Sequence, residues 1–80
     1  MTDPVEVTDV ADIVLARWKE ILGADNADPA DDFFLSGGSS LLAIRLINQL
    51  REDLRVRLRV LTIFEHSTLG EFVREVERST

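Results

Sequence analysis

The stretch DFFLSGGSSLLA, residues 32–43, decides how this chain folds, because it leads from a loop into a helix. Two aromatic residues precede two glycines and two serines, and an apolar run with helical spacing follows. Glycine lets the backbone approach closely, and either Ser39 or Ser40 can cap the helix. We therefore expect a helix that begins at Ser39 or Ser40 and ends near Asp53.

The apolar side chains of this helix gather on one side at 100° per residue. They are Leu46, Leu50, Ala43, Leu54 and Ile47, with Leu42 at the margin, and the opposite side carries Arg45, Asn48, Gln49 and Glu52. Leu41 and Ile44 break the pattern, since they lie on the polar side near Ser40. Single exposed apolar residues are common and need no explanation. Two of them beside a small residue at a helix start favour a docking patch.

A first helix is predicted over residues 9–22, where Thr8 or Asp9 can cap the start and Gly23 can close the end. Its apolar positions repeat with helical spacing. They are Val10, Ile13, Val14, Trp18, Ile21 and Leu22.

A long loop from Ala24 to Ser36 follows, because this segment has neither a helical nor a strand period. We expect Phe33 and Phe34 to anchor it in the core. Residues 55–59 alternate in polarity, but no second segment offers a strand partner, so they are predicted to form an extended linker.

The last third of the chain predicts a short helix over Val60 to Glu65 and a longer one after it. Thr68 and Glu71 have the spacing of a capping box. The apolar positions of the final helix are Leu69, Phe72, Val73 and Val76. The fold class is therefore all-α, a four-helix bundle with three longer helices and one short, in a single domain over residues 1–80.

Length and composition exclude several classes of protein. Eighty residues are too few for most independent catalytic folds, so a self-contained enzyme is not expected. The absence of cysteine excludes disulfides and thiolate metal sites, and one histidine cannot build a zinc cluster. A net charge of −6 argues against nucleic acid. The chain has no run long enough for a membrane span and no signal-peptide pattern, which predicts a cytoplasmic protein.

Charge is unevenly distributed along the chain. Residues 1–32 hold nine acidic and two basic side chains, whereas residues 33–80 hold six acidic and seven basic ones. Because the second half is nearly neutral, docking near Ser40 is expected to depend more on Leu41 and Ile44 than on bulk charge.

The serines at the helix start lie where backbone N–H groups and the positive end of the helix dipole favour a bound or attached phosphate. A hydrolase nucleophile is excluded, because no G-x-S-x-G elbow surrounds either serine and His66 is the only histidine. A phosphate-binding loop of the G-x-x-x-x-G-K-[ST] type needs a lysine that this stretch lacks. The acidic loop also fails as a calcium loop, because alanine stands at the third position counted from Asp25 or Asp28.

The stretch from Asp31 to Ala43 resembles the signature D-x-F-F-x-x-G-G-x-S-L-x-A of the peptidyl carrier domains of nonribosomal peptide synthetases. The expected order of helices also resembles that family, which belongs to the acyl carrier type. The resemblance implies a non-catalytic protein whose Ser40 receives 4'-phosphopantetheine from coenzyme A. The arm would then hold an aminoacyl or peptidyl group as a thioester, with Gly37 and Gly38 beside the attachment site.

The resemblance also implies partners for the chain. These are a phosphopantetheinyl transferase, an adenylation enzyme or domain, and condensation or tailoring enzymes, with Leu41, Ile44 and Arg45 as the docking residues. Ser39 stands where the family usually has histidine or aspartate. Neither Ser36 nor Ser39 is interpreted as the modified residue; they are interpreted as loop and cap residues. Arg55 stands where the family often has glycine, and Arg59 where it commonly has proline or serine, so this chain departs from the family at the local turn.

Two alternatives stay open. One is a carrier of a polyketide or aryl-acid pathway, although the arginines of the second helix, Arg45 and Arg51, favour the peptidyl type over a fatty-acid carrier with its strongly acidic second helix. The other is a small helical interaction module that carries nothing and uses Leu41 and Ile44 for a protein partner. We expect a monomer that binds neither nucleic acid nor membrane. A start at Met1 is consistent with a free-standing carrier, although an excised synthetase domain would look the same.

Overall fold

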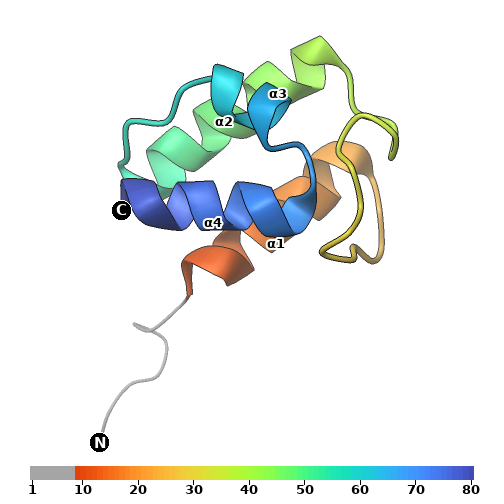
Figure 1. The fold of residues 1–80 in the computed structure, drawn as a ribbon, viewed down its shortest axis with the longest axis horizontal. Coiled ribbons are helices and arrows are strands. Elements are labelled where there is room, and N and C mark those ends of the chain that lie inside the picture. Colours follow the sequence, from red (N-terminus) through yellow and green to blue (C-terminus); the bar gives the residue numbers. More distant parts are fainter. Residues whose placement is uncertain (1–8) are drawn as a thin grey trace, which may run out of the picture.

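Four helices make up the part of the chain that this computed structural model describes, residues 9–80 (Figure 1). They are α1 (Val10–Leu22), α2 (Ser40–Leu54), α3 (Leu61–Glu65) and α4 (Leu69–Ser79). Residues 9–80 contain no strand. The one β-type contact recorded among them is an isolated antiparallel bridge between Asp32 and Thr68. The expected all-α bundle with three longer helices and one short is confirmed.

Helix α1 follows its predicted bounds to within one residue. Val14 and Trp18 are buried, as the apolar spacing predicts. Gly23 ends the helix in the left-handed conformation at φ 65°, which costs glycine little because it has no Cβ. Asp9 stands at the N-cap without a side-chain cap bond, and Thr8 lies outside the described residues.

Helix α2 buries the predicted face and begins as predicted. Its fully buried residues are Ala43, Leu46, Ile47 and Leu50.

An ion pair joins α2 to α1. Arg17 donates from Nε to Asp53 Oδ2 at 2.6 Å and from a terminal nitrogen to Asp53 Oδ1 at 3.0 Å. Hydrogen bonds to Asp53, and then to Glu20, raise the pKa of Arg17 above its ordinary value.

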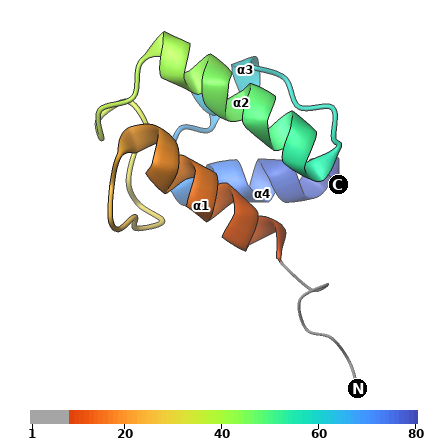
Figure 2. The same ribbon diagram turned by 180° about the vertical axis from the view of Figure 1, so that it is seen from behind.

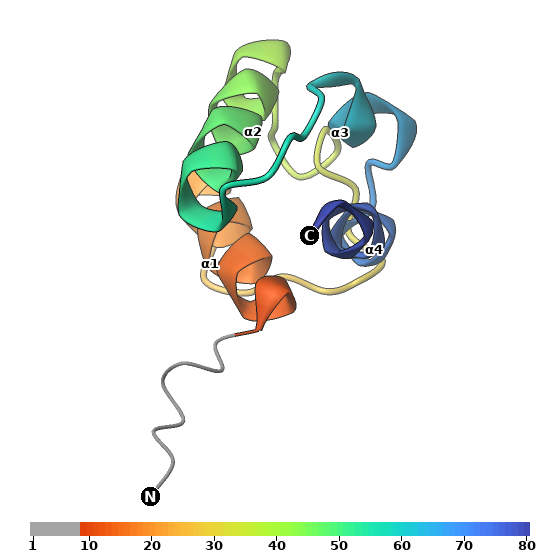
Figure 3. The same cartoon turned by 90° about the vertical axis from the view of Figure 1, so that its left-hand side faces the viewer.

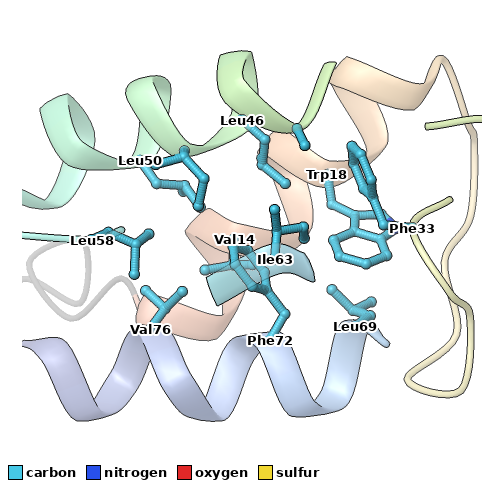
Figure 4. Close-up of a cluster of buried hydrophobic side chains, with 12 residues drawn as sticks. Val14, Trp18, Phe33, Leu46, Leu50, Leu58, Ile63, Leu69, Phe72 and Val76 are labelled. Carbon is cyan, nitrogen blue, oxygen red and sulfur yellow. The ribbon is translucent and has the colours of Figure 1, made fainter. Parts of the chain in front are cut away.

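The core lies between α2 and α4, with α1 closing one side (Figures 2 and 4). Trp18 of α1 meets the ring of Phe33 edge to face at 5.2 Å between centroids, and Phe72 of α4 lies 6.0 Å away on another side. Helix α4 contributes Leu69, Phe72 and Val76 to this core. The predicted apolar face of the last helix is thereby confirmed, with Val73 at its half-buried margin.

The predicted capping box at the start of α4 is wrong. Thr68 is the N-cap residue, but its side chain makes no cap hydrogen bond. The first amides of α4 instead donate to carbonyl oxygens of the long loop, Leu69 to Asp31 at 2.9 Å and Gly70 to Pro29 at 2.9 Å. The Glu71 carboxylate lies 3.8 Å from His66 Nδ1. Backbone carbonyls of a distant segment therefore satisfy the first two amides of α4.

The connection between α2 and α3, residues 55–60, contains neither helix nor strand, in agreement with the rejection of a strand there, and α3 begins one residue later than predicted. Leu58 is buried in mid-linker, and Arg51 of α2 donates to its carbonyl oxygen at 2.6 Å. Figure 3 shows the linker crossing between α2 and α3.

Candidate functional site

The loop before α2 is tied to the start of α4 at several points. In addition to the two amide bonds from α4, the Phe33 amide donates to the Ser67 carbonyl at 2.8 Å. The Asp32 carboxylate accepts from the amides of Phe34 and Leu35 through Oδ1, at 2.9 and 3.2 Å, and from the Ser67 hydroxyl through Oδ2 at 2.6 Å. The Ser67 bond first, and then the two amide bonds, lower the pKa of Asp32.

Asp32 is a positioning residue that the sequence analysis did not single out. Its bonds to Phe34 and Leu35 are local, and an aspartate followed by a turn is a known signal for such bonds. Its bond to Ser67 spans 35 residues, and no local pattern reveals it. The carboxylate thus fixes the turn that leads into the glycines.

The glycines shape the turn that delivers the serines. The Gly38 amide donates to the Phe33 carbonyl at 2.9 Å, and a Cβ built on Gly38 would overlap the Phe33 ring. Gly37 has a φ of 107°, which L side chains rarely adopt, and the space around its missing Cβ is open. The structure therefore requires glycine at Gly38 for packing and at Gly37 for conformation.

The two neighbouring serines have different environments. Ser39 is the N-cap of α2, and its Oγ accepts a hydrogen bond from the Leu42 amide at 3.2 Å. Ser40 is the first residue of the helix, and its hydroxyl has no hydrogen bond within residues 9–80, although both serines are exposed. Ser36 is also exposed, but it belongs to the turn, where its amide donates to the Asp32 carbonyl at 3.0 Å.

The backbone around Ser40 suits a negatively charged substituent. Within residues 9–80, the amides of Ser40 and Leu41 have no hydrogen-bond acceptor, and the first turn of α2 has no acidic side chain. These amides lie at the positive end of the α2 dipole. A phosphodiester on the Ser40 hydroxyl would find two donors beside it and no carboxylate of that turn to repel it.

The residues expected to dock a partner are exposed. Leu41 is 72% exposed and Ile44 41%, so both lie off the buried face as predicted, and Arg45 is exposed as well. The structure adds three exposed apolar residues that the sequence analysis did not identify. They are Leu35, Leu61 and Phe64.

Phe34 differs from its expected place. Whereas Phe33 is fully buried as predicted, Phe34 is half-buried and stacks on Phe64 of α3, with ring centroids 5.1 Å apart and planes inclined by 22°. The ring of Phe34 also meets that of Phe33 edge to face at 5.2 Å. Phe34 therefore joins α3 to the loop that carries the serines, and it is not a core residue.

Residues 9–80 hold no cluster of three or more His, Cys, Asp or Glu side chains placed to bind a metal ion. No helix in the same part of the chain has the length and apolar content needed to cross a membrane.

The family described as "Phosphopantetheine attachment site" matches residues 12–76 of this chain. Among individual proteins, the chain is 34% identical over 80 residues to nonribosomal peptide synthetase easA of Emericella nidulans, a match that covers 98% of the chain. It is 32% identical over 78 residues to polyketide synthase PksN of Bacillus subtilis, covering 94% of the chain. The match spans only 1% of either synthase.

A solved structure gives the same fold. The type-II acyl-carrier-protein BlmI from Streptomyces verticillus, involved in bleomycin biosynthesis, has a TM-score of 0.80 and 29% sequence identity to this chain. The superposition covers 86% of this chain and 83% of BlmI.

Proposed function

This chain belongs to the phosphopantetheine attachment family, whose members are non-catalytic carriers with a covalent 4'-phosphopantetheine, and from that premise we propose that Ser40 is the attachment residue. The observation that carries the proposal is the difference between Ser39 and Ser40. Both side chains are exposed, but the hydroxyl of Ser39 accepts the cap hydrogen bond, whereas that of Ser40 has no hydrogen bond within residues 9–80 and lies beside two amides without acceptors.

The surroundings of Ser40 favour the attached phosphodiester. The helix N-terminus contributes about 0.3–1 kcal/mol toward an anion at this place, which is enough to bias its orientation. Gly37 and Gly38 bring the backbone to the attachment point, and Gly38 does so by packing against Phe33. The arm ends in a thiol, which supplies the thioester that holds the carried group.

The carried group that we propose is an aminoacyl or peptidyl group, as in nonribosomal peptide biosynthesis. The two aromatics and two glycines before Ser40 support this type, as does the similarity to the synthetase easA. The second candidate is an acyl group of a polyketide or aryl-acid pathway, and the similarity to polyketide synthase PksN is the observation that favours it. Because the chain belongs to the attachment family, the alternative of a helical interaction module that carries no group is excluded.

The proposed partners are those that act on a carrier of this kind. A phosphopantetheinyl transferase modifies Ser40, an adenylation enzyme or domain loads the thiol, and condensation or tailoring enzymes use the thioester. We propose Leu41, Ile44 and Arg45 as their contact residues, because these side chains are exposed on α2 within about 8 Å of axial rise from Ser40. The proposal treats residues 1–80 as one carrier domain that acts as a monomer.

One experiment tests the attachment residue. The chain is incubated with coenzyme A and a broad-specificity phosphopantetheinyl transferase, and its mass is then measured. One phosphopantetheine is expected on the parent chain and on Ser39→Ala, and none on Ser40→Ala. A modified Ser40→Ala, or an unmodified parent chain, would overturn the assignment.

A second experiment identifies the carried group. The modified chain is offered to adenylating enzymes that activate amino acids, aryl acids or other acyl groups, and the thioester formed is identified by mass. Loading with an amino acid supports the peptidyl type. Loading with aryl or other acyl groups alone would contradict it and support the second candidate, a carrier of a polyketide or aryl-acid pathway.

A further inference from the structure

Ser67, in the connection between α3 and α4, holds the loop before α2 at two points. Its carbonyl oxygen accepts a hydrogen bond from the Phe33 amide at 2.8 Å, and its hydroxyl donates to Asp32 Oδ2 at 2.6 Å. The connection runs beside the loop (Figure 1), although 35 residues separate Ser67 from Asp32 in the sequence. One residue from the second half of the chain therefore contacts two consecutive residues of this loop.

The two residues that Ser67 holds are the ones that organise the turn of residues 32–38. Asp32 accepts from three amides of this turn, two through Oδ1 and one through its carbonyl oxygen. These are the amides of Phe34, Leu35 and Ser36. The Phe33 carbonyl accepts from the Gly38 amide at 2.9 Å, so four amides of the turn depend on Asp32 and Phe33.

The turn leads directly to the proposed attachment residue. Gly38 closes it, Ser39 follows as the N-cap of α2, and Ser40 is the first residue of the helix. The middle of the turn, residues 35–37, is exposed. Exposed segments with few buried contacts open locally at a lower free energy than core helices do. The turn therefore depends on contacts from elsewhere in the fold to keep one arrangement in front of Ser40.

The bond from Ser67 is the strongest of these contacts that a side chain supplies through a hydrogen bond. A hydroxyl that donates to an ionised carboxylate makes a shorter and stronger bond than a neutral pair does. The same bond is the largest cause of the lowered pKa of Asp32, as is expected where a donor stabilises the ionised form. Both side chains are half-buried, which protects the bond from competing water.

We propose that Ser67 is a positioning residue for the modification of Ser40 and that it acts through Asp32. The inference rests on the proposed function, because it concerns the reaction assigned to Ser40. With the Ser67 hydroxyl in place, the turn keeps the arrangement that presents Ser40 at the start of α2. Without it, the Asp32 carboxylate is no longer tied to the α3–α4 connection, and the transferase meets the competent arrangement less often.

A purely structural role for Ser67 leads to a different expectation. A contact that contributes only to global stability leaves the folded molecules as they were, so its loss does not alter the kinetics of modification well below the melting temperature. Loss of positioning lowers the fraction of folded molecules that are competent. The apparent affinity of the transferase for the carrier falls with that fraction, so KM rises while kcat stays the same.

The test compares Ser67→Ala with two control variants of the full chain. Thr68→Ala removes the neighbouring hydroxyl, which makes no cap bond. Val76→Ala lowers global stability from a buried position of α4 at the end of the core away from Phe33 (Figure 4). Circular dichroism first shows that each variant is folded at the assay temperature. The transfer from coenzyme A by a broad-specificity transferase then gives kcat and KM for the carrier, with coenzyme A saturating.

We expect Ser67→Ala to raise KM for the carrier by about threefold with kcat within about twofold of the parent. In the unmodified chain, the backbone order parameters of residues 34–38 measured by NMR should fall from about 0.85 toward about 0.6. Thr68→Ala and Val76→Ala should leave both quantities as in the parent. An unchanged KM or unchanged order parameters in Ser67→Ala would overturn the inference. An equal rise in KM for Val76→Ala would overturn it too, because global stability would then be the cause.

A double-mutant cycle tests the route through Asp32. Asp32→Ala removes the carboxylate, so the Ser67 hydroxyl has nothing left to hold. In this background, Ser67→Ala should change KM by less than about 1.5-fold, because residues that act through one contact are not additive. If the effects of the two substitutions multiply instead, Ser67 acts by another route and the assignment is wrong.

Failure of this inference is distinguishable from failure of the proposed function. If the parent chain gains no phosphopantetheine on Ser40, the attachment proposal fails, while the order parameters still report whether Ser67 holds the turn. If the parent is modified on Ser40 and Ser67→Ala behaves like Thr68→Ala, only the positioning inference fails.

Discussion

The Ser39 hydroxyl accepts a hydrogen bond from the Leu42 amide at 3.2 Å, so the residue that caps α2 is the neighbour of the proposed attachment residue. Substitutions of the two serines should therefore have different effects on stability and on modification. Ser39→Ala is expected to lower the free energy of unfolding by about 1 kcal/mol, because it removes the cap, and to keep the modification. Ser40→Ala should change that free energy by less than about 0.5 kcal/mol and lose the modification. Urea unfolding and intact mass measure the two effects, and equal destabilisation by both variants would contradict the assigned roles.

Gly38 should not tolerate a side chain. Gly38→Ala places a methyl group against the buried ring of Phe33 and is expected to cost about 1–3 kcal/mol of stability through overpacking. Ser36→Ala, in the exposed part of the same turn, is the control and should change little. Thermal unfolding checks both variants, and a Gly38→Ala protein as stable as the control would show that this packing is loose.

Arg55 is a place where the chain can be stabilised. It ends α2 at φ 55° and ψ 45°, and it is the one non-glycine residue with positive φ among residues 9–80. The left-handed conformation places Cβ too close to the following carbonyl, so Arg55→Gly should raise the free energy of unfolding by about 0.5–1 kcal/mol. Arg57→Gly, in the extended linker, should lower it instead, because glycine there only adds entropy to the unfolded chain. If both substitutions lower stability in urea, the strain at Arg55 is not significant.

The Asp32 carboxylate makes stability depend on pH. Its pKa is lowered in the folded protein, so its contribution is present above the unfolded value of about 3.9 and is lost as the pH falls through the lower folded value. Asp32→Asn should therefore cost about 1 kcal/mol at pH 7, mainly through the bond to Ser67, and less at pH 3. Urea unfolding at the two pH values checks this, with Asp25→Asn as an exposed control. A cost that stays the same at pH 3 would exclude the charged form as its cause.

Ile44 should matter to partners more than to the fold. Because its side chain is 41% exposed, Ile44→Asp is expected to leave the helix content nearly unchanged and to reduce kcat/KM for loading by about fivefold. Ile47→Asp, which places a carboxylate at a fully buried position of the same helix, should unfold the protein. Circular dichroism and loading rates separate the two outcomes. An unfolded Ile44→Asp protein would mean that Ile44 belongs to the core.

Periodicity predicted most of this fold. The buried faces of α1, α2 and α4 follow the spacing of apolar residues, because burial of one stripe per helix is what stabilises a bundle this small. The exposure of Leu41 and Ile44 followed from the same spacing. The rejection of a strand at residues 55–59 was correct, since a strand needs a partner and the sequence offers none.

Several features that the sequence did not predict involve residues far apart in the chain. The start of α4 is satisfied by carbonyls of Pro29 and Asp31, so the local capping box at Thr68 was the wrong interpretation. The half-buried place of Phe34 depends on Phe64, 30 residues away, and the role of Asp32 depends on Ser67. Local spacing has no information about such pairs. The attachment residue itself was assigned from a resemblance, because spacing alone did not distinguish Ser40 from a plain helix cap.

The packing of Gly38 on Phe33 has a consequence for how far a carried group can travel. Since the ring of Phe33 is fully buried and the backbone of Gly38 rests against it, the chain two residues before the proposed attachment residue Ser40 is anchored to the core. The loop then adds almost no reach of its own. The radius within which a thioester carried on Ser40, as proposed, can visit active sites is set by the length of the arm and by the movement of the whole domain.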